Sequence, residues 1–418
     1  MRSRKHARGA RRYGGAGGLC ARDVNDLAAG ILQRSLNLAD HGPKCTVGAV
    51  LTVLLFAAAR VTSIYDACRR LARAPSDQAV RDALGDMLPK TMPVLERRLN
   101  DALAERVPKG VLRKSRPVAI DTHSDPYYGK PHKRQKELRR GKRERGTSRF
   151  HCYATLCLLH RGRRYTLAAT YVWKADTYER VVRRLLERAR AAGLRVRYLL
   201  LDRAFYNVAV VRYLRSVRCP FLMPVVHRGR RPKGETAEQL KRLKGTRRFL
   251  AWRHGGFAEH TMDNRKTRTT VRIAVACRAE KTRSGKVRRK SPLVFAFRGF
   301  RPPSPAWAKG HYRRRFGIES SYRQANQARA RTCCRDPRVR LLLFALALLL
   351  RNLWVWVHER VLGRPCGRGV RLRLHLLRFR TLLLMLQRCA EETFGCAETA
   401  STPIRLPARP LGTKPMTG

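Results

Sequence analysis

Acidic residues are scarce in this sequence. Only 29 of its 418 residues are Asp or Glu, against 92 Lys or Arg, so the formal net charge is +63. A protein so cationic repels itself unless a polyanion neutralises its surface, and nucleic acid is the commonest polyanion in cells. The charge balance therefore argues against an enzyme of small acidic metabolites and favours a protein that binds nucleic acid.

Long apolar runs and paired cysteines are also missing. The longest apolar run, Leu341 to Leu350, ends at Arg351 and falls short of the roughly 20 residues that a membrane span needs, so we expect a buried helix and no membrane partner. The 12 cysteines form no CxxC pair and no cluster at zinc-ligand spacing, which argues against a zinc finger and a disulfide framework. Hydrophobic residues make up 44% of the chain, enough for a substantial core.

The N-terminus is basic. Six of its first 12 residues are Lys or Arg, and no apolar stretch follows directly, which argues against a secretory signal. Two interpretations remain, a mobile arm that grips phosphate and a mitochondrial transit peptide. We favour the arm, and we expect a cytoplasmic, nucleoid-associated protein.

Residues 21–112 carry helical patterns. Ser63 precedes an apolar stripe that begins at Ile64, and Pro75 and Ser76 start a further helix through Met87. Short helices with exposed arginines are typical of a helix-turn-helix module that binds DNA, and equally of a bundle that only supports the next domain. Both interpretations stay open, and the sequence does not say which helix would read DNA.

From about residue 116 the pattern is that of an α/β protein, a mixed sheet flanked by helices. The expected elements are a strand at 117–121, a hairpin of 151–159 and 165–173, a helix capped by Thr177, a strand at 196–201, a helix at 206–217 and a strand at 219–226. Between residue 227 and about residue 300 the helical rhythm stops, and it resumes at Trp307. Beyond residue 400, four prolines mark a disordered tail.

These patterns divide the chain into six segments. We predict a disordered basic arm (1–20), a helical N-terminal domain (21–112), the first part of a catalytic core (113–226), a β-rich insertion (227–303), the second part of the core (304–362), and a helical segment with a disordered tail (363–418).

Three acids in this core are candidates for chemistry. Asp121 and Asp202 each end an apolar strand, and carboxylates at the ends of neighbouring strands converge at one sheet edge. Phosphodiester chemistry needs such oxygen ligands to hold two Mg²⁺ ions about 3.5 to 4 Å apart. For two isolated aspartates, however, a structural pairing with arginine is the simpler interpretation.

Glu319 supplies a third carboxylate. Its spacing from Tyr312, Arg315 and Asn326 places all four residues along one helical face. In that arrangement Glu319 completes the metal cage, Arg315 binds a phosphate beside it, and Tyr312 contacts the DNA end. An ordinary solvated helix face is the alternative.

The segments IDTHSDPYYG around Asp121, LLLDRAFY around Asp202 and YRRRFGIESSYRQ around Glu319 together resemble the DDE transposases of bacterial and archaeal insertion sequences with a Tyr-Arg-Glu-Lys signature. The resemblance covers roughly residues 115–360. It implies a ribonuclease-H-like core with a β-rich insertion, and cut-and-paste transposition in which the three acids hold two Mg²⁺ ions, with Mn²⁺ as the expected substitute. It further implies double-stranded DNA as substrate, both the terminal inverted repeats of the element and its target, a synaptic homodimer, and a DNA hairpin in second-strand cleavage.

The chain departs from this signature at one position. Asn326 stands where the family has Lys, so Arg323 and Arg329 on the same helix are the candidate substitutes for its phosphate contact. Asp125 is a second acid in the first motif, but we expect it in a turn beyond the strand and therefore prefer Asp121. Two neighbouring tyrosines, Tyr127 and Tyr128, either stack on an unpaired base or pack under the sheet.

Three basic segments, 133–149, 228–248 and 281–290, are either solvated loops or clamps on DNA phosphates, and we favour clamps. In the first segment the candidate contacts are Lys133, Arg134, Arg139 and Arg140. The competing functions are a metal nuclease of the same fold without strand transfer, and a decayed or domesticated transposase that only binds DNA. An RNA-associated basic protein would explain the charge but not the ordered acids.

Overall fold

The computed structural model describes residues 18–397, except 131–135, 145, 161–162, 231–232, 234–235, 265, 278, 282–286, 290–291 and 367–368. Most of the predicted basic arm, the tail beyond residue 400, Lys133, Arg134 and most of the segment 281–290 therefore lie outside the described residues.

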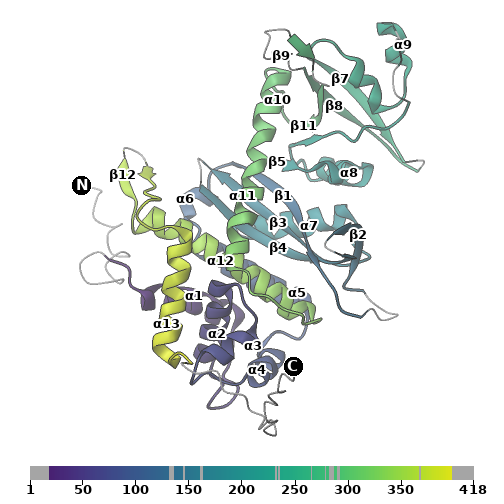
Figure 1. The fold of residues 1–418 in the computed structure, drawn as a ribbon. Helices are drawn as coiled ribbons and strands as arrows, with labels where there is room; N and C mark the ends of the chain where they lie inside the picture. Colours follow the sequence, from purple (N-terminus) through teal and green to yellow (C-terminus); the bar gives the residue numbers. More distant parts are fainter. Residues whose placement is uncertain are drawn as a thin grey trace, which may run out of the picture.

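A helical bundle forms the N-terminal part of the chain. Its helices are α1 (Ala21–Leu36), α2 (Val47–Arg60), α3 (Ile64–Arg70), α4 (Asp77–Met87), α5 (Met92–Glu105) and the short α6 (Lys109–Leu112). Ser63 and Ser76 cap α3 and α4 through their side chains, as their positions in the sequence predict. The last described helix, α13 (Phe379–Phe394), packs on α1 and α2 and so completes the same bundle (Figure 1).

The core sheet is mixed, as predicted. Its strands are β1 (Arg116–Pro126), β2 (Arg139–Glu144), β3 (Thr147–His160), β4 (Arg163–Val172), β5 (Val196–Leu201) and β6 (Phe221–Pro224). The strands β1, β5 and β6 are parallel neighbours, β3 runs antiparallel to β1, and both β2 and β4 pair with β3. Because β2 occupies residues 139–144, the basic segment 133–149 is not a loop throughout.

Helices α7 (Tyr178–Ala191) and α8 (Val208–Ser216) belong to this core. Thr177 caps α7, and Gly193 beyond its end has a positive φ of 83°, a conformation that glycine adopts without a steric penalty. The buried face of α7 is the one that its sequence predicts, made of Val181, Val182, Leu185, Leu186 and Ala189.

Residues 227–303, for which the sequence predicts a β-rich insertion, continue the core sheet. The strands β7 (Gly256–Asp263), β8 (Arg268–Ala276) and β11 (Leu293–Arg298) are antiparallel, and β11 pairs with β6 of the core. The same region holds α9 (Ala237–Arg242), the 3₁₀ turn η4 (Thr246–Ala251) and the small ladder of β9 (Ala279–Lys281) and β10 (Val287–Arg289). The insertion is therefore an extension of the core sheet, at the top of Figure 1.

The chain then returns to the core as a broken helix. Its parts are α10 (Pro305–Tyr312), the 3₁₀ turn η5 (Arg313–Arg315), α11 (Phe316–Ala325) and the 3₁₀ turn η6 (Asn326–Ala328). Helix α12 (Pro337–Arg360) follows, and a short hairpin of β12 (Arg364–Cys366) and β13 (Gly369–Arg371), which the sequence did not predict, leads to α13. Among the described helices, α12 alone is long and apolar enough to cross a membrane, but 94% of its apolar window is buried, so it is the buried helix predicted from the sequence.

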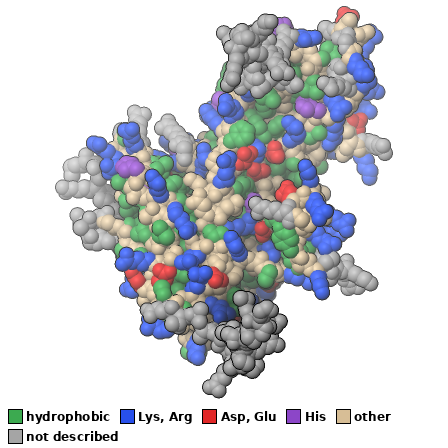
Figure 2. Space-filling view, in the orientation of Figure 1, with side chains coloured by type: hydrophobic (Ala, Val, Ile, Leu, Met, Phe, Trp, Pro, Cys, Tyr) green, Lys and Arg blue, Asp and Glu red, His purple; other side chains and the backbone are tan. Residues whose placement is uncertain are grey.

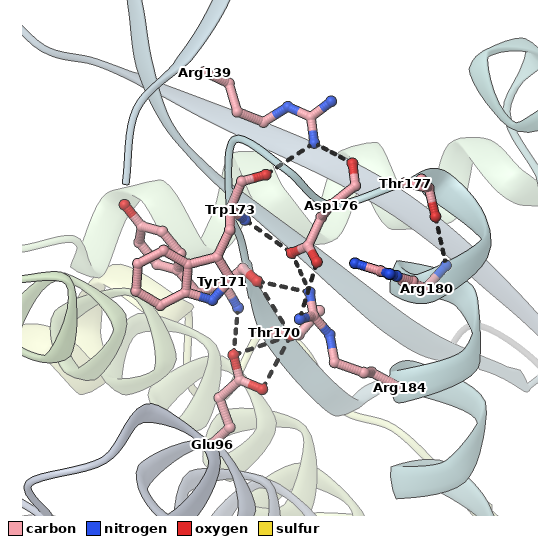
Figure 3. A network of polar contacts seen from close by, with 9 residues as sticks. All are labelled: Glu96, Arg139, Thr170, Tyr171, Trp173, Asp176, Thr177, Arg180 and Arg184. Atoms are coloured by element: carbon pink, nitrogen blue, oxygen red, sulfur yellow. Dashed lines mark hydrogen bonds and ion pairs between the residues drawn. The ribbon is translucent and has the colours of Figure 1, made fainter. Parts of the chain in front are cut away.

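Side chains from α5 and α12 cover the outer edge of β4. Each satisfies backbone groups that have no partner strand, which removes the exposed edge as a template for aggregation. The pairs are Asn352 with Thr166, Asn100 with Ala169, and Glu96 with Tyr171. Burial raises the pKa of Glu96, although it accepts the N–H of Tyr171 and the hydroxyl of Thr170 (Figure 3). These contacts fix the helical bundle against the sheet.

Candidate active site

The predicted acids Asp121, Asp202 and Glu319 come from three separate elements. Asp121 lies in β1, Asp202 directly follows β5, and Glu319 lies in α11, which packs against β1. Because Ile120 pairs with Leu201 in the parallel register of the two strands, Asp121 and Asp202 are the next residues on neighbouring strands. The fold therefore brings together the three acids that the sequence singles out.

Arg315 lies between the three carboxylates. Its Nη1 donates to Oδ2 of Asp121 at 3.1 Å, and its Nη2 donates to Oε1 of Glu319 at 2.7 Å. The same Nη2 lies 3.8 Å from Oδ1 of Asp202, close enough for an ion pair but not for a hydrogen bond. The side chain of Arg315 is only 9% exposed, whereas those of Asp202 and Glu319 are 41% and 35% exposed. One buried guanidinium thus contacts all three acids.

The site carries an excess of negative charge. Burial raises the pKa of Asp121 to about 6, Arg315 and the backbone N–H of Thr122 oppose that shift, and the carboxylates of Asp202 and Glu319 add to it. The shift is upward although Arg315 is in contact, because burial and two like charges together outweigh one guanidinium. A further cation would be stabilised here.

The donor chemistry of this site fits Mg²⁺ or Mn²⁺, which prefer carboxylate oxygens. Asp121 is anchored in the sheet, and the more exposed Asp202 and Glu319 are open to solvent. In the described part of the chain, no three His, Cys, Asp or Glu side chains stand in an arrangement that holds a metal ion. The guanidinium of Arg315 occupies the space between the acids instead.

The predicted common helix face of Tyr312, Arg315, Glu319 and Asn326 is interrupted. Tyr312 ends α10, Arg315 lies in the tighter 3₁₀ turn η5, and Asn326 begins the turn η6, so the four positions do not follow one α-helical period. Tyr312 is buried, its ring packs against Phe295, and burial raises the pKa of its hydroxyl. Its ring centroid lies 5.7 Å from the guanidinium of Arg315, so the buried ring of Tyr312 makes a cation–π contact that stabilises the position of Arg315.

The two candidate substitutes for the signature lysine differ in their surroundings. Arg323 is exposed on α11, as is Asn326 in η6. Arg329 is bound within the protein, because its Nη2 lies 2.9 Å from Oδ2 of Asp125 and its Nη1 contacts the ring of His123. Of the two, only Arg323 is placed to meet an external phosphate.

Asp125 does not lie in a turn, which corrects the expectation from sequence. The strand β1 continues to Pro126 in register with β3, so Asp121 is not at its end and Asp125 is inside it. The Asp125 carboxylate lies within 3.1 Å of Arg340 as well as beside Arg329. Two guanidinium groups neutralise it, which favours Asp121 as the reactive acid of this strand.

Some of the tyrosines and arginines in and after the first motif are bound within the protein, and others are exposed to solvent. Tyr127 is 5% exposed and packs edge-on against His151, whereas Tyr128 is 66% exposed. Arg139 donates to the backbone carbonyls of Trp173 and Asp176 (Figure 3), and Arg140 is exposed on β2. The predicted DNA contacts of Lys133, Arg134, Arg139 and Arg140 stay predictions, and Nη1 of Arg139 also binds the end of β4 and the turn after it.

Sequence reasoning missed Tyr322 and a group of arginines on the insertion. Tyr322 lies one helical turn after Glu319 and contacts the backbone of Asp121, a position that its spacing of three residues reveals. On the insertion, Arg272 and Arg298 line a hollow of about 530 Å³. Burial lowers the pKa of Arg298, and the nearby charges of Arg215 and Arg272 lower it further. Lys and Arg side chains cover much of the visible face in Figure 2, with Asp and Glu in only a few places.

Comparisons with known proteins bear on this arrangement. The family model described as "Transposase DDE domain" matches residues 113–353, which contain all three acids. A solved structure described as "Cryo-EM structure of piggyBac transposase synaptic complex with hairpin DNA (SNHP)" is similar with a TM-score of 0.53 and 11% sequence identity, over 90% of this chain and 81% of that chain. No curated protein matches the sequence. The likeness of fold agrees with the ribonuclease-H-like core expected from the sequence.

Proposed function

The chain belongs to the transposase DDE domain family, and from that premise we propose that it moves an insertion sequence by cut-and-paste transposition. The resemblance to DDE transposases that its motifs predict is confirmed, and the protein is a DNA transposase. The proposal goes further, to metal-dependent strand cleavage and strand transfer at terminal inverted repeats.

One observation carries the proposal: Asp121, Asp202 and Glu319 all lie within 4 Å of one guanidinium, that of Arg315. Carboxylates that crowd together are mutually repulsive and are retained in proteins where a cation or a reaction requires them. In a chain with only 29 acids, three of them around one guanidinium are best explained by such a requirement.

The residues of the site have separate tasks in this reaction. When bound, two Mg²⁺ ions would activate the attacking oxygen and stabilise the leaving oxygen of an in-line displacement at phosphorus. Asp121, rigid in the sheet, fixes the position of the site, and the more exposed Asp202 and Glu319 face the DNA. Arg315 and Arg323 contribute positive charge toward the phosphates that flank the scissile bond. No covalent intermediate with the protein is required, because water and then the freed 3′-hydroxyl are the nucleophiles.

The remaining parts of the proposal concern partners. We expect two copies of the protein to hold two element ends in a synaptic dimer, and second-strand cleavage to pass through a DNA hairpin. The net charge of +63 supports broad contact with DNA, and a cytoplasmic location at the nucleoid follows from that partner. The N-terminal bundle and the arginine-lined hollow of the insertion are the surfaces that we expect to contact DNA outside the catalytic site.

The test uses the full-length protein, Mg²⁺, and a DNA duplex that carries a terminal inverted repeat with flanking sequence from its own locus. We expect the wild type to cut at the repeat and to join the 3′ end to a target plasmid. Asp202→Asn should bind the duplex as the wild type does and should neither cut nor join. The exposed Glu187 on α7 supplies the matched control, because Glu187→Gln removes one negative charge from a helix that contributes no residue to the site.

Each outcome separates the candidates. Cleavage without joined products would identify a metal nuclease rather than a transposase. Binding by the wild type without any cleavage would point to a decayed protein that only binds DNA. Equal cleavage by the wild type and by Asp202→Asn would overturn the assigned site.

A further inference from the structure

Arg315 is an unusual occupant of the space between three carboxylates. Its guanidinium has five N–H donors, and among them Nη1 and Nη2 donate hydrogen bonds to Asp121 and Glu319. Its Nε is buried and has no hydrogen-bond partner among the described residues. A buried donor without a partner is costly, so this position is held by the charge of the acids rather than by a complete set of hydrogen bonds.

The charges at the site show what Arg315 does there. Three ionised carboxylates and one guanidinium leave a net charge of −2, so Arg315 reduces the repulsion between the acids but does not cancel it. Two divalent cations would bring four positive charges to the same acids, and the total would become positive with Arg315 still in place. The guanidinium and the metal ions therefore compete for the same oxygens.

The local structure allows Arg315 to leave. Arg315 lies in the 3₁₀ turn η5, which interrupts the helix between α10 and α11, and such turns often mark hinges. The ring of Phe316, the next residue, is 50% exposed and its centroid lies 5.9 Å from the guanidinium. If the guanidinium of Arg315 moved outward from the acids, it would stay in contact with the ring of Phe316.

We propose that Arg315 is an internal counterion of the catalytic acids, which holds them while no metal is bound and transfers to a DNA phosphate when metal ions and DNA arrive together. This inference rests on the proposed function, because it takes the acids as the metal ligands. It makes Arg315 a positioning residue and couples the binding of metal to the binding of DNA.

The first test measures metal binding without DNA. Free Mn²⁺ is followed by electron paramagnetic resonance as it is titrated into the full-length wild type and into Arg315→Gln. Because the competing charge is gone, we expect Arg315→Gln to bind Mn²⁺ at least about tenfold more tightly than the wild type. Arg313→Gln is the matched control, because Arg313 is an exposed arginine of the same turn and its removal changes the net charge equally.

A second measurement guards against misfolding. Arg315→Gln leaves three acids without a counterion, so its melting temperature without metal should fall below that of the wild type, and Mn²⁺ should raise it by more than it raises that of the wild type. If Arg315→Gln binds Mn²⁺ no more tightly than Arg313→Gln does, or gains no extra stability from it, Arg315 is not the counterion. Arg315→Lys, which keeps the charge, should bind Mn²⁺ less tightly than Arg315→Gln.

The coupling has its own test. Addition of a duplex element end should tighten Mn²⁺ binding to the wild type more than to Arg315→Gln, because only the wild type frees its acids by giving Arg315 to a phosphate. Equal tightening in both proteins would overturn the transfer to DNA. The two hypotheses fail separately. If the wild type neither binds Mn²⁺ nor cleaves DNA, the proposed function is rejected. If the wild type cleaves DNA and Arg315→Gln binds Mn²⁺ only as tightly as the wild type does, this inference alone is rejected.

Discussion

The hydroxyl of Tyr322 donates a hydrogen bond of 3.2 Å to the backbone carbonyl of Asp121. The same hydroxyl lies 2.6 Å from Oγ1 of Thr155 on the neighbouring strand, and since its proton is directed to Asp121 it accepts from Thr155. Tyr322 lies one turn after Glu319 on α11, so this contact holds the helix of the third acid against the strand of the first acid. It fixes the separation of two candidate metal ligands without touching either carboxylate.

Tyr322→Phe should therefore slow cleavage without weakening the binding of DNA. The substitution removes both hydrogen bonds and keeps the ring beside that of His123. A shift of about 1 Å between reacting groups costs up to about a hundredfold in rate, so we expect the single-turnover cleavage rate to fall by about ten- to a hundredfold. Tyr165→Phe is the control, because it removes another buried tyrosine hydroxyl, one that donates to Glu359 away from the three acids. A loss of DNA affinity at an unchanged cleavage rate would contradict this role.

Arg298→Gln should reduce the salt dependence of DNA binding. Arg298 lines a hollow of the insertion with Arg272, and the charges of Arg215 and Arg272 act on it, so positive charge gathers there. If Arg298 contacts one phosphate, the slope of log K against log salt concentration should become less steep by about 0.9. The exposed Arg183, which pairs with Glu179 on α7 and lies outside both the helical bundle and the hollow, supplies the control substitution Arg183→Gln. Equal slopes for Arg298→Gln and the wild type would exclude the hollow from the DNA interface.

His151 should make the fold sensitive to acid. Tyr171 donates its hydroxyl proton to the carbonyl of Glu137, so the Nδ1–H of His151 donates to Tyr171 and its Nε2 is left as a buried acceptor with no partner in the described structure. Burial lowers the pKa of His151 to about 3, with help from the charges of Arg340 and Arg329. As the pH falls, the imidazole of His151 is therefore protonated in the unfolded chain before it is protonated in the folded protein. Its contribution to the free energy of unfolding is fully present above pH 6.5 and is lost as the pH falls toward 3.

Urea unfolding at pH 7.5 and 4.5 measures this effect. At pH 4.5 the contribution of His151 to the loss of unfolding free energy should be about 2 to 3 kcal/mol. His151→Phe should start from a lower stability and lose less of it between the two pH values, whereas His375→Phe, at an exposed position, should lose as much as the wild type. The same pH dependence in His151→Phe as in the wild type would show that the imidazole is not responsible.

The sequence was sufficient for much of the core because its patterns are local. The helix after Thr177 has its cap, its apolar face and its terminal glycine within one segment, and the strands around Asp121 and Asp202 are short apolar runs. The predicted end of the first of these strands at residue 121 is wrong, because Ser124, Asp125 and Pro126 have the composition of a turn and yet belong to β1. Pairing with β3 overrides that local preference, and Arg329 and Arg340 neutralise the acid from more than 200 residues away.

The same limit applies to the candidate site. Spacing along one helix suggested that Arg315 and Glu319 are neighbours, and that is correct, but it gives no information about a carboxylate 194 residues earlier. The position of Arg315 among all three acids, the pairing of β11 with β6 and the packing of α13 on α2 are long-range contacts. Only the assembled fold reveals them.

Asn100 should be required for stability and not for chemistry. Its side chain accepts the N–H of Ala169 at 2.7 Å and donates to the carbonyl of the same residue at 3.1 Å, at the outer edge of β4. Asn100→Ala leaves both backbone groups buried without partners, and each such group costs about 1 to 3 kcal/mol, so we expect the unfolding free energy to fall by about 3 kcal/mol. The freed edge should also make the protein aggregate at high concentration, because it offers unpaired groups to a second chain.

Equilibrium unfolding and light scattering test this prediction, together with cleavage at a temperature where the variant is folded. Asn25→Ala is the control, because Asn25 is another buried asparagine of the bundle, on α1, and its Oδ1 has no hydrogen-bond partner among the described residues. The control should lose much less stability, and both variants should cleave DNA at the rate of the wild type. Of these two asparagines, Asn100 is the one that binds the edge of β4. An equal loss of stability in the two variants would therefore mean that burial of the side chain, and not the pairing with β4, accounts for the effect.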